Sequence, residues 1–123
     1  MKKLTALLFL TSLFLGWSSF SHAGVSAVFT GKKYIATITE HCDEGNVSCG
    51  DVSFDSKSIM TGNEIRLKGK TVNINCPDVC DFRGYEFHNG AYLYYLVAGN
   101  GDEWNFYITK NGKEISKDVG VFK

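Results

Sequence analysis

The residues with the most distinctive chemistry in this chain are four cysteines, Cys42, Cys49, Cys76 and Cys80. An even number of cysteines in a small domain outside the cytosol is typical of disulfides. Three pairings exist in principle, and the turn-forming residues within each close pair favour Cys42–Cys49 and Cys76–Cys80. A four-thiolate zinc site near His41 is the alternative, but its spacings differ from those of common zinc motifs. We expect two structural disulfides, no metal site and no cofactor.

A second candidate for chemistry is the polar cluster of Glu40, His41, Asp43 and Glu44, whose residue types can serve in acid–base catalysis. It lies beside Cys42 in a stretch predicted to be a solvated loop closed by a disulfide. The sequence contains no G-x-S-x-G nucleophile motif, no H-E-x-x-H metal motif and no glycine-rich phosphate loop. We therefore expect a binding protein and not an enzyme.

The first 23 residues have the pattern of a secretory signal. Lys2 and Lys3 precede an apolar run that extends from Leu4 to Trp17, and small residues then flank a cleavage site after Ala23. A membrane span needs about 20 apolar residues, and this run is shorter. We expect a signal peptide over residues 1–23, one domain over residues 24–123, a periplasmic location and no stable membrane insertion.

The charge balance of residues 24–123 argues against a nucleic-acid partner. The chain has 13 basic and 13 acidic residues, and removal of Lys2 and Lys3 leaves 11 basic residues and a net charge of −2. Nucleic-acid binding requires a clustered positive surface. A domain of this size buries only a modest core, so disulfides would help to stabilise it.

Short apolar runs separated by Gly and Asn predict an all-β fold, a small antiparallel sandwich or barrel. Asn89-Gly90 and Asn111-Gly112 are typical of tight hairpin turns, because both residue types tolerate positive φ. The predicted strands are 25–30, 33–40, 51–56, 63–68, 70–75, 82–88, 91–98, 103–109 and 113–116.

Residues 91–98 are almost all apolar, so alternation does not show which of their faces is buried. A three-residue turn at 88–90 would bury Tyr85 and Phe87 and leave Glu86 outside, where its charge is not desolvated. A four-residue turn at 99–102 would pair Ala98 with Glu103. This register predicts a core face of Leu93, Tyr95, Val97, Trp104, Phe106 and Ile108.

The same register predicts an outward aromatic surface. A soluble monomer rarely leaves such a patch bare, and tyrosine is favoured at interfaces. We therefore expect it to bind a partner, although a second sheet covering this face or a homodimer are alternatives. Its residues are Phe82, Tyr92, Tyr94, Leu96 and Tyr107, edged by Glu86, Glu103 and Asn105.

The run from Phe82 to Tyr92, with the signal, the 100-residue β-domain and the two disulfides, resembles small periplasmic inhibitors. The nearest resemblance is to the periplasmic immunity proteins of type VI secretion systems, which neutralise a peptidoglycan-cleaving muramidase carried on a VgrG-type spike. It covers essentially all of residues 24–123. Bacterial lysozyme inhibitors are a related group, but their Ser-Gly-x-x-Tyr signature is absent here.

The resemblance implies an immunity protein that occludes the active-site cleft of a cognate peptidoglycan hydrolase toxin. In such a complex Tyr92 and Tyr94 would be the anchors, because tyrosine fills a cleft at low conformational cost. Glu86 and Glu103 would pair with basic groups at the rim of the cleft. Inhibition of a host lysozyme and binding of a small ligand inside a barrel are the alternatives.

Overall fold

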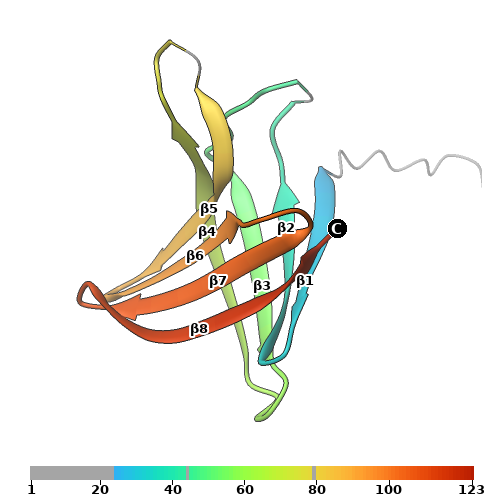
Figure 1. Ribbon diagram of the computed structural model, residues 1–123, viewed down its shortest axis with the longest axis vertical. Helices are drawn as coiled ribbons and strands as arrows, with labels where there is room; N and C mark the ends of the chain where they lie inside the picture. The colour runs from blue at the N-terminus through green and yellow to red at the C-terminus, as the bar shows by residue number, and fades with distance from the viewer. Residues whose placement is uncertain (1–23, 44, 79) are drawn as a thin grey trace, which may run out of the picture.

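The computed structural model describes residues 24–123 except 44 and 79 (Figure 1). The predicted signal peptide, residues 1–23, lies outside the described residues. Those described contain no helix that is long and apolar enough to cross a membrane. They form eight antiparallel strands, β1 (Val25–Gly31), β2 (Tyr34–Glu40), β3 (Val52–Ser58), β4 (Glu64–Ile74), β5 (Asp81–Asn89), β6 (Tyr92–Ala98), β7 (Glu103–Lys110) and β8 (Lys113–Phe122).

Each strand pairs with the next along the chain, and β8 pairs with β1, so the sheet closes into a barrel. The predicted all-β antiparallel fold with two disulfides is confirmed, and of the two architectures considered the barrel is the one that forms. Closure pairs the edge strands β1 and β8 with each other, which protects their backbone groups from association with other chains.

One long strand, β4, replaces the two strands predicted at 63–68 and 70–75. Gly69 lies in its middle, where a turn was expected. A Cβ atom at Gly69 would lie 2.0 Å from the carbonyl oxygen of Glu86 and 2.4 Å from the ring of Phe87. The glycine therefore permits a close approach of β4 and β5 where the sheet bends, which is a common use of glycine within a strand.

Four phenylalanine rings fill the middle of the barrel. Phe29, Phe54, Phe87 and Phe106 come from β1, β3, β5 and β7, and each is at most 1% exposed. The centroid of the Phe54 ring lies 4.4 Å from that of Phe87, on which it stacks, and 5.9 Å from that of Phe106. An eight-stranded barrel is just wide enough to be filled by side chains. Ligand or partner binding is therefore confined to the two ends of the barrel and its outer wall.

Both turns that flank β6 differ from the predicted ones. The amide of Gly99 donates a hydrogen bond to the carbonyl oxygen of Glu103 at 2.8 Å, so the turn after β6 consists of residues 100–102. The turn before β6 consists of Gly90 and Ala91, because Asn89 pairs with Tyr92. By contrast, the predicted Asn111-Gly112 turn is confirmed, and both residues have positive φ.

These turns reverse the predicted faces of β6. Leu96 is fully buried, and Tyr92 and Tyr94 pack against the core, so the prediction that all three face outward is wrong. Leu93, Tyr95 and Val97 were predicted to lie in the core and instead point outward. The predicted faces of β5 and β7 are confirmed, with Tyr85, Phe87, Phe106 and Ile108 buried and Trp104 packed against the core.

A buried carboxylate organises the turn between β1 and β2. Asp118, on β8 and only 4% exposed, accepts hydrogen bonds from the amides of Lys32, Lys33 and Tyr34 at 3.1, 2.8 and 3.0 Å. A Cβ atom at Gly31 would lie 2.1 Å from Asp118 Oδ2, so glycine leaves room for the carboxylate. One side chain of β8 thereby fixes the start of β2.

Candidate functional site

Successive connections alternate between the two ends of the barrel. The end with loops 41–51 and 75–80 and turn 99–102 is called the disulfide end, and the end with turns 32–33, 59–63, 90–91 and 111–112 is called the mouth. The six predicted partner-binding residues do not form one patch. Phe82 and Glu103 lie at the disulfide end, Tyr92 and Tyr94 at the mouth, and Glu86 and Tyr107 on the outer wall.

On the outer wall, Glu86 and Tyr107 belong to a single cross-strand row. Direct partners in the sheet place Lys70, Glu86, Tyr95, Tyr107 and Lys117 side by side on β4 to β8. The Lys70 ammonium lies 3.6 Å from the Glu86 carboxylate, and that of Lys117 lies 5.5 Å from the centre of the Tyr107 ring. Tyrosines do lie on the outer wall, as predicted, but they are Tyr95 and Tyr107; Tyr92 and Tyr94 are not among them.

The loops of the disulfide end are cross-linked by two disulfides and by hydrogen bonds. Both predicted disulfides are confirmed, Cys42–Cys49 within the loop after β2 and Cys76–Cys80 between β4 and β5. Two disulfides are compatible with a secreted or periplasmic protein, because they persist in oxidising compartments. Each disulfide constrains a loop that has no regular secondary structure.

The outer ends of β4 and β5 extend beyond the neighbouring strands as a projecting hairpin (Figure 1). Its tip, residues 75–80, is closed by the Cys76–Cys80 disulfide. The amide of Cys80 donates to the carbonyl oxygen of Asn75 at 3.3 Å, and the Asn75 side-chain amide donates to Asp81 at 3.2 Å. The tip is therefore held by covalent and hydrogen bonds within itself.

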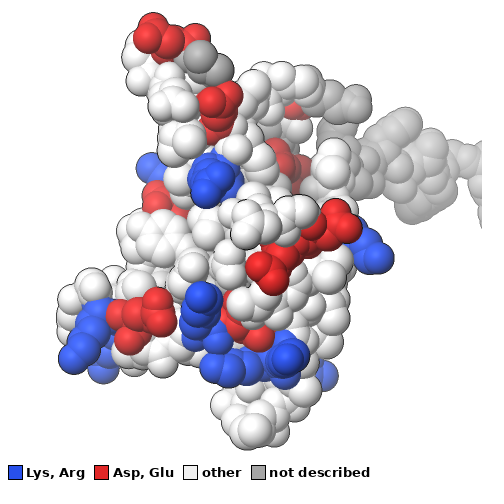
Figure 2. Space-filling view, viewed as in Figure 1, with Lys and Arg blue, Asp and Glu red and all other residues white. Residues whose placement is uncertain are grey.

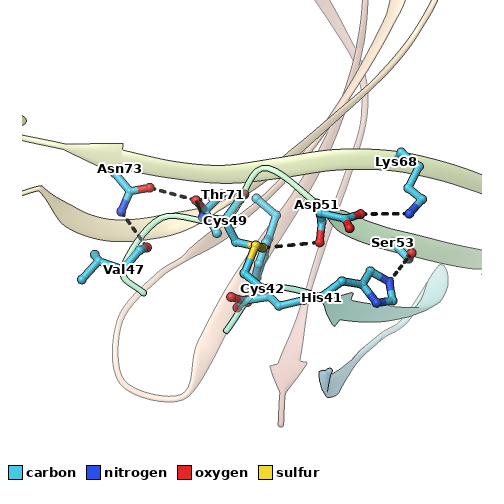
Figure 3. Close-up of a disulfide and its surroundings, with 11 residues drawn as sticks. His41, Cys42, Val47, Cys49, Asp51, Ser53, Lys68, Thr71 and Asn73 are labelled. Carbon is cyan, nitrogen blue, oxygen red and sulfur yellow. Dashed lines mark hydrogen bonds and ion pairs between the residues drawn. A yellow bond between two sulfur atoms is a disulfide. The ribbon is translucent and has the colours of Figure 1, made fainter. Parts of the chain in front are cut away.

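The projecting hairpin is also joined to the Cys42–Cys49 loop (Figure 3). The amide of Thr71 donates to the carbonyl oxygen of Cys49, and the Cys49 amide donates to the Thr71 hydroxyl, both at 2.9 Å. Further out, the Asn73 side-chain amide donates to the carbonyl oxygen of Val47 at 3.1 Å. Hydrogen bonds thus join the Cys42–Cys49 loop to the projecting hairpin as one unit.

Exposed apolar and acidic side chains share this unit. Val47, Ile74 and Phe82 are 52%, 43% and 40% exposed. Acidic groups gather at the tip of the projecting hairpin and at the turn after β6 (Figure 2). The exposed acidic residues of the described disulfide end are Asp43, Asp51, Asp78, Asp81, Asp102 and Glu103; Asp51 is paired with Lys68, and the other nearby cations are Arg83 and, when protonated, His41.

Aromatic rings close the barrel beneath this surface. The Phe82 ring centroid lies 5.2 Å from that of Tyr85 and 6.4 Å from that of Trp104, and Trp104 lies 4.6 Å from Phe122. The Tyr85 hydroxyl donates a 2.6 Å hydrogen bond to Glu40. Phe82, predicted as a partner contact, is therefore the exposed outer member of a packed aromatic layer.

Burial, and then the hydrogen bond to Glu40, raise the pKa of Tyr85 above its usual value near 10. Since the folded state disfavours the phenolate, the stabilising contribution of Tyr85 is complete below pH 10 and falls as pH rises above it. We expect the unfolding free energy to drop more steeply between pH 9 and pH 11 in the wild type than in Tyr85→Phe, measured in urea. Equal slopes would contradict this coupling.

The two disulfides should contribute differently to the stability of the fold. Each closes a short loop, so loss of either should cost about 2 kcal/mol through the chain entropy of the unfolded state. In Cys42→Ser/Cys49→Ser we expect a further loss of stability, because Cys49 is buried and is bonded to Thr71. We expect Cys76→Ser/Cys80→Ser to unfold closer to the wild type. Urea unfolding of both variants measures the order, and the reverse order would refute it.

The polar cluster considered for catalysis is dispersed in the structure. Glu40 points to Tyr85, whereas the His41 ring bonds to the Ser53 hydroxyl at 2.7 Å on the outer wall. Nearby, the ammonium of Lys68 donates to Asp51 at 3.0 Å and lowers the pKa of that carboxyl (Figure 3). Glu44 lies outside the described residues. Over the part of the chain that is described, no cluster of His, Cys, Asp and Glu could hold a metal ion.

Several residues that build the disulfide end were missed in the sequence, notably Thr71 and Asn73, whose bonds join the two loops. The acidic part of this surface did have a signal in the sequence, because Asp43, Asp78 and Asp81 each lie within two residues of a cysteine.

Comparison of the chain with protein-family models, with curated proteins and with solved structures gives no match.

Proposed function

We propose that this chain is a periplasmic immunity protein that binds a peptidoglycan hydrolase toxin and occludes its active-site cleft with the disulfide end. The observation that supports this is the projecting hairpin, closed by Cys76–Cys80 and bonded to the Cys42–Cys49 loop. A projecting element suits a concave cleft, and one cross-linked by disulfides and hydrogen bonds loses less conformational entropy on burial than an unconstrained loop.

Charge supports the same partner class. Peptidoglycan carries carboxylates, so an enzyme that acts on it gains from a basic surface around its cleft. The exposed acidic residues of the disulfide end other than Asp51, which is paired with Lys68, are complementary to such a surface. Val47, Ile74 and Phe82 supply apolar contacts beside them, as the centre of an interface requires.

Of the six residues predicted from the sequence to bind the partner, this proposal retains Phe82 and Glu103. Tyr92 and Tyr94 are at the opposite end of the barrel and Glu86 and Tyr107 are on its wall, so none of these four belongs to the docking surface. Binding and not catalysis is the proposed activity, because the disulfide end is organised by structural bonds between loops.

The test uses the protein recovered from the periplasm of cells that express the full chain. It is mixed with the peptidoglycan hydrolase encoded beside its gene and, separately, with a host lysozyme, and lysis of purified sacculi is followed. We expect one equivalent to stop lysis by the neighbouring enzyme. Inhibition of the host lysozyme alone would assign the protein to host defence instead. Undiminished lysis by both enzymes with excess protein would refute the proposal.

A further inference from the structure

The mouth of the barrel contains a cavity that the proposed docking does not use. Its volume is about 330 Å³, near the lower limit of small-molecule sites. It therefore suits a single small ring and not an extended ligand. The lining residues come from β2, β3, β4, β6, β7 and the turn after β3, and they are Tyr34, Ser56, Ser58, Thr61, Asn63, Glu64, Ile65, Tyr94 and Ile108.

Two tyrosine side chains, Tyr34 and Tyr94, line this cavity. The ring of Tyr34 meets that of Phe106 edge-on at 5.2 Å, and the ring of Tyr94 lies 6.3 Å from Phe106 and 5.8 Å from Phe54. Tyr34 and Tyr94 thus rest on the central rings from different strands. Their faces can receive the C–H groups of a sugar ring, because an aromatic face carries partial negative charge.

Hydrogen-bonding groups surround the same space. Ser56, Ser58, Thr61 and Asn63 are among its lining residues; the hydroxyls of Ser58 and Thr61 accept backbone hydrogen bonds and keep their own protons to donate. In the described part of the chain, no buried side-chain nitrogen or oxygen lacks a partner. Polar atoms of the cavity that make no bond within the protein are therefore in contact with water. A ligand rich in hydroxyls can replace such water while keeping the hydrogen bonds.

The tyrosine hydroxyls lie close enough to influence one another. Burial, followed by the neighbouring Tyr92 and Tyr34, raises the pKa of Tyr94. The Lys110 ammonium lies 5.3 Å from the centre of the Tyr92 ring, which places a cation beside this group.

Lysines predominate at the rim. A second cavity of about 360 Å³ adjoins the first through Tyr34, Ser58 and Thr61 and is lined by Lys32 and Lys33. Asp118 fixes the backbone of these two lysines, as described above. The exposed rim of the described mouth has the cations Lys32, Lys33, Lys110 and Lys113 and the anions Glu64 and Glu114. The four cations outnumber the two anions, which favours a negatively charged ligand. Its charge would lie toward Lys32 and Lys33 in the second cavity, because Glu64 lines the first.

We propose that the mouth binds a small acidic saccharide, a sugar ring that carries a carboxylate. The ring packs against Tyr34 and Tyr94, its hydroxyls bond to the serine, threonine and asparagine side chains, and its carboxylate faces Lys32 and Lys33. The site lies at the end opposite the docking surface, so it stands whether or not the protein inhibits a hydrolase.

The experiment is an NMR titration of the isotope-labelled protein, recovered from the periplasm, with N-acetylmuramic acid and with N-acetylglucosamine, which lacks the carboxylate. We expect saturable shifts at residues 32–34, 58–65 and 92–94, with tighter binding of the acidic sugar. Absence of saturable shifts, shifts centred outside the mouth, or equal affinity for the two sugars would each overturn the proposal.

Variants distinguish the contribution of the two lysine charges to binding from that of the residues that line the cavity. We expect Lys32→Gln/Lys33→Gln to weaken binding of the acidic sugar about three- to tenfold and to leave the neutral sugar unaffected. Tyr94→Leu, which removes the aromatic ring against which the sugar packs, should weaken binding of both sugars. Lys70→Gln/Lys117→Gln, which removes the same two charges from the outer wall, is the matched control and should bind like the wild type. An equal loss in this control would also overturn the proposal, since it would show only a general effect of net charge.

Discussion

Reversal of two charges at the tip of the projecting hairpin, Asp78→Lys/Asp81→Lys, is expected to weaken binding to the hydrolase by about 30-fold, or about 2 kcal/mol. Both side chains are exposed beyond the barrel, so the barrel does not depend on their charge; Asp81→Lys also removes the hydrogen bond from Asn75 within the tip, which the Cys76–Cys80 disulfide still closes. In the complex the two aspartates would face the basic rim of the cleft, and lysines at the same positions would repel that rim. Association kinetics measured by surface plasmon resonance test this, and the loss should be mainly in the association rate.

The matched control is Asp55→Lys/Glu114→Lys, which reverses two exposed acidic residues away from the disulfide end. It has the same net charge as the tip variant, so any difference between them reflects position. We expect the control to bind like the wild type, and the effect of the tip variant to shrink at high ionic strength. Equal weakening of both variants would reject the hairpin as the docking element, even if the protein proved to be an inhibitor.

Replacement of Asp118 by alanine is expected to lower the unfolding free energy by about 3 kcal/mol, the largest effect that we predict for a polar residue. Four backbone amides, those of Lys32, Lys33, Tyr34 and Val119, would lose their acceptor at once. A buried donor without a partner costs about 1–3 kcal/mol, and access to water at the turn reduces the sum. Urea unfolding provides the measurement.

Asp118→Asn should have an intermediate stability, because its side-chain amide retains one acceptor oxygen. If the alanine variant does not fold, the asparagine variant tests the same prediction. Asp55→Ala is the control. It breaks the exposed ion pair with Arg66, in which the two side chains are 55% and 81% exposed, and should change stability by less than about 1 kcal/mol. An alanine variant at position 118 as stable as this control would show that the carboxylate does not support the turn.

The sequence sufficed where the signal is local. Turn residues between close cysteines predicted both disulfides, and Asn111-Gly112 predicted its hairpin because few other residues adopt positive φ. Along β5 and β7 polar and apolar residues alternate, and there the buried positions Phe87 and Phe106 were assigned correctly.

The predicted partner surface failed because β6 lacks that contrast. With apolar residues on both of its faces, its orientation depends on turn lengths, and a different count at the turns exchanged Tyr94 for Tyr95. The predicted residues were consequently divided among the two ends and the wall of the barrel. Of the present docking surface, Phe82 and Glu103 were anticipated, whereas the joining bonds of Thr71 and Asn73 were not.

By itself, then, the sequence determined the all-β class, the disulfides and the strongest turn, because each depends on neighbours along the chain. Only the tertiary structure decided that the sheet closes, that Gly69 lies within one bent strand, and that Asp118 holds a turn 85 residues away. Those features arise when β8 meets β1, and contacts between residues so far apart depend on the register of every strand between them.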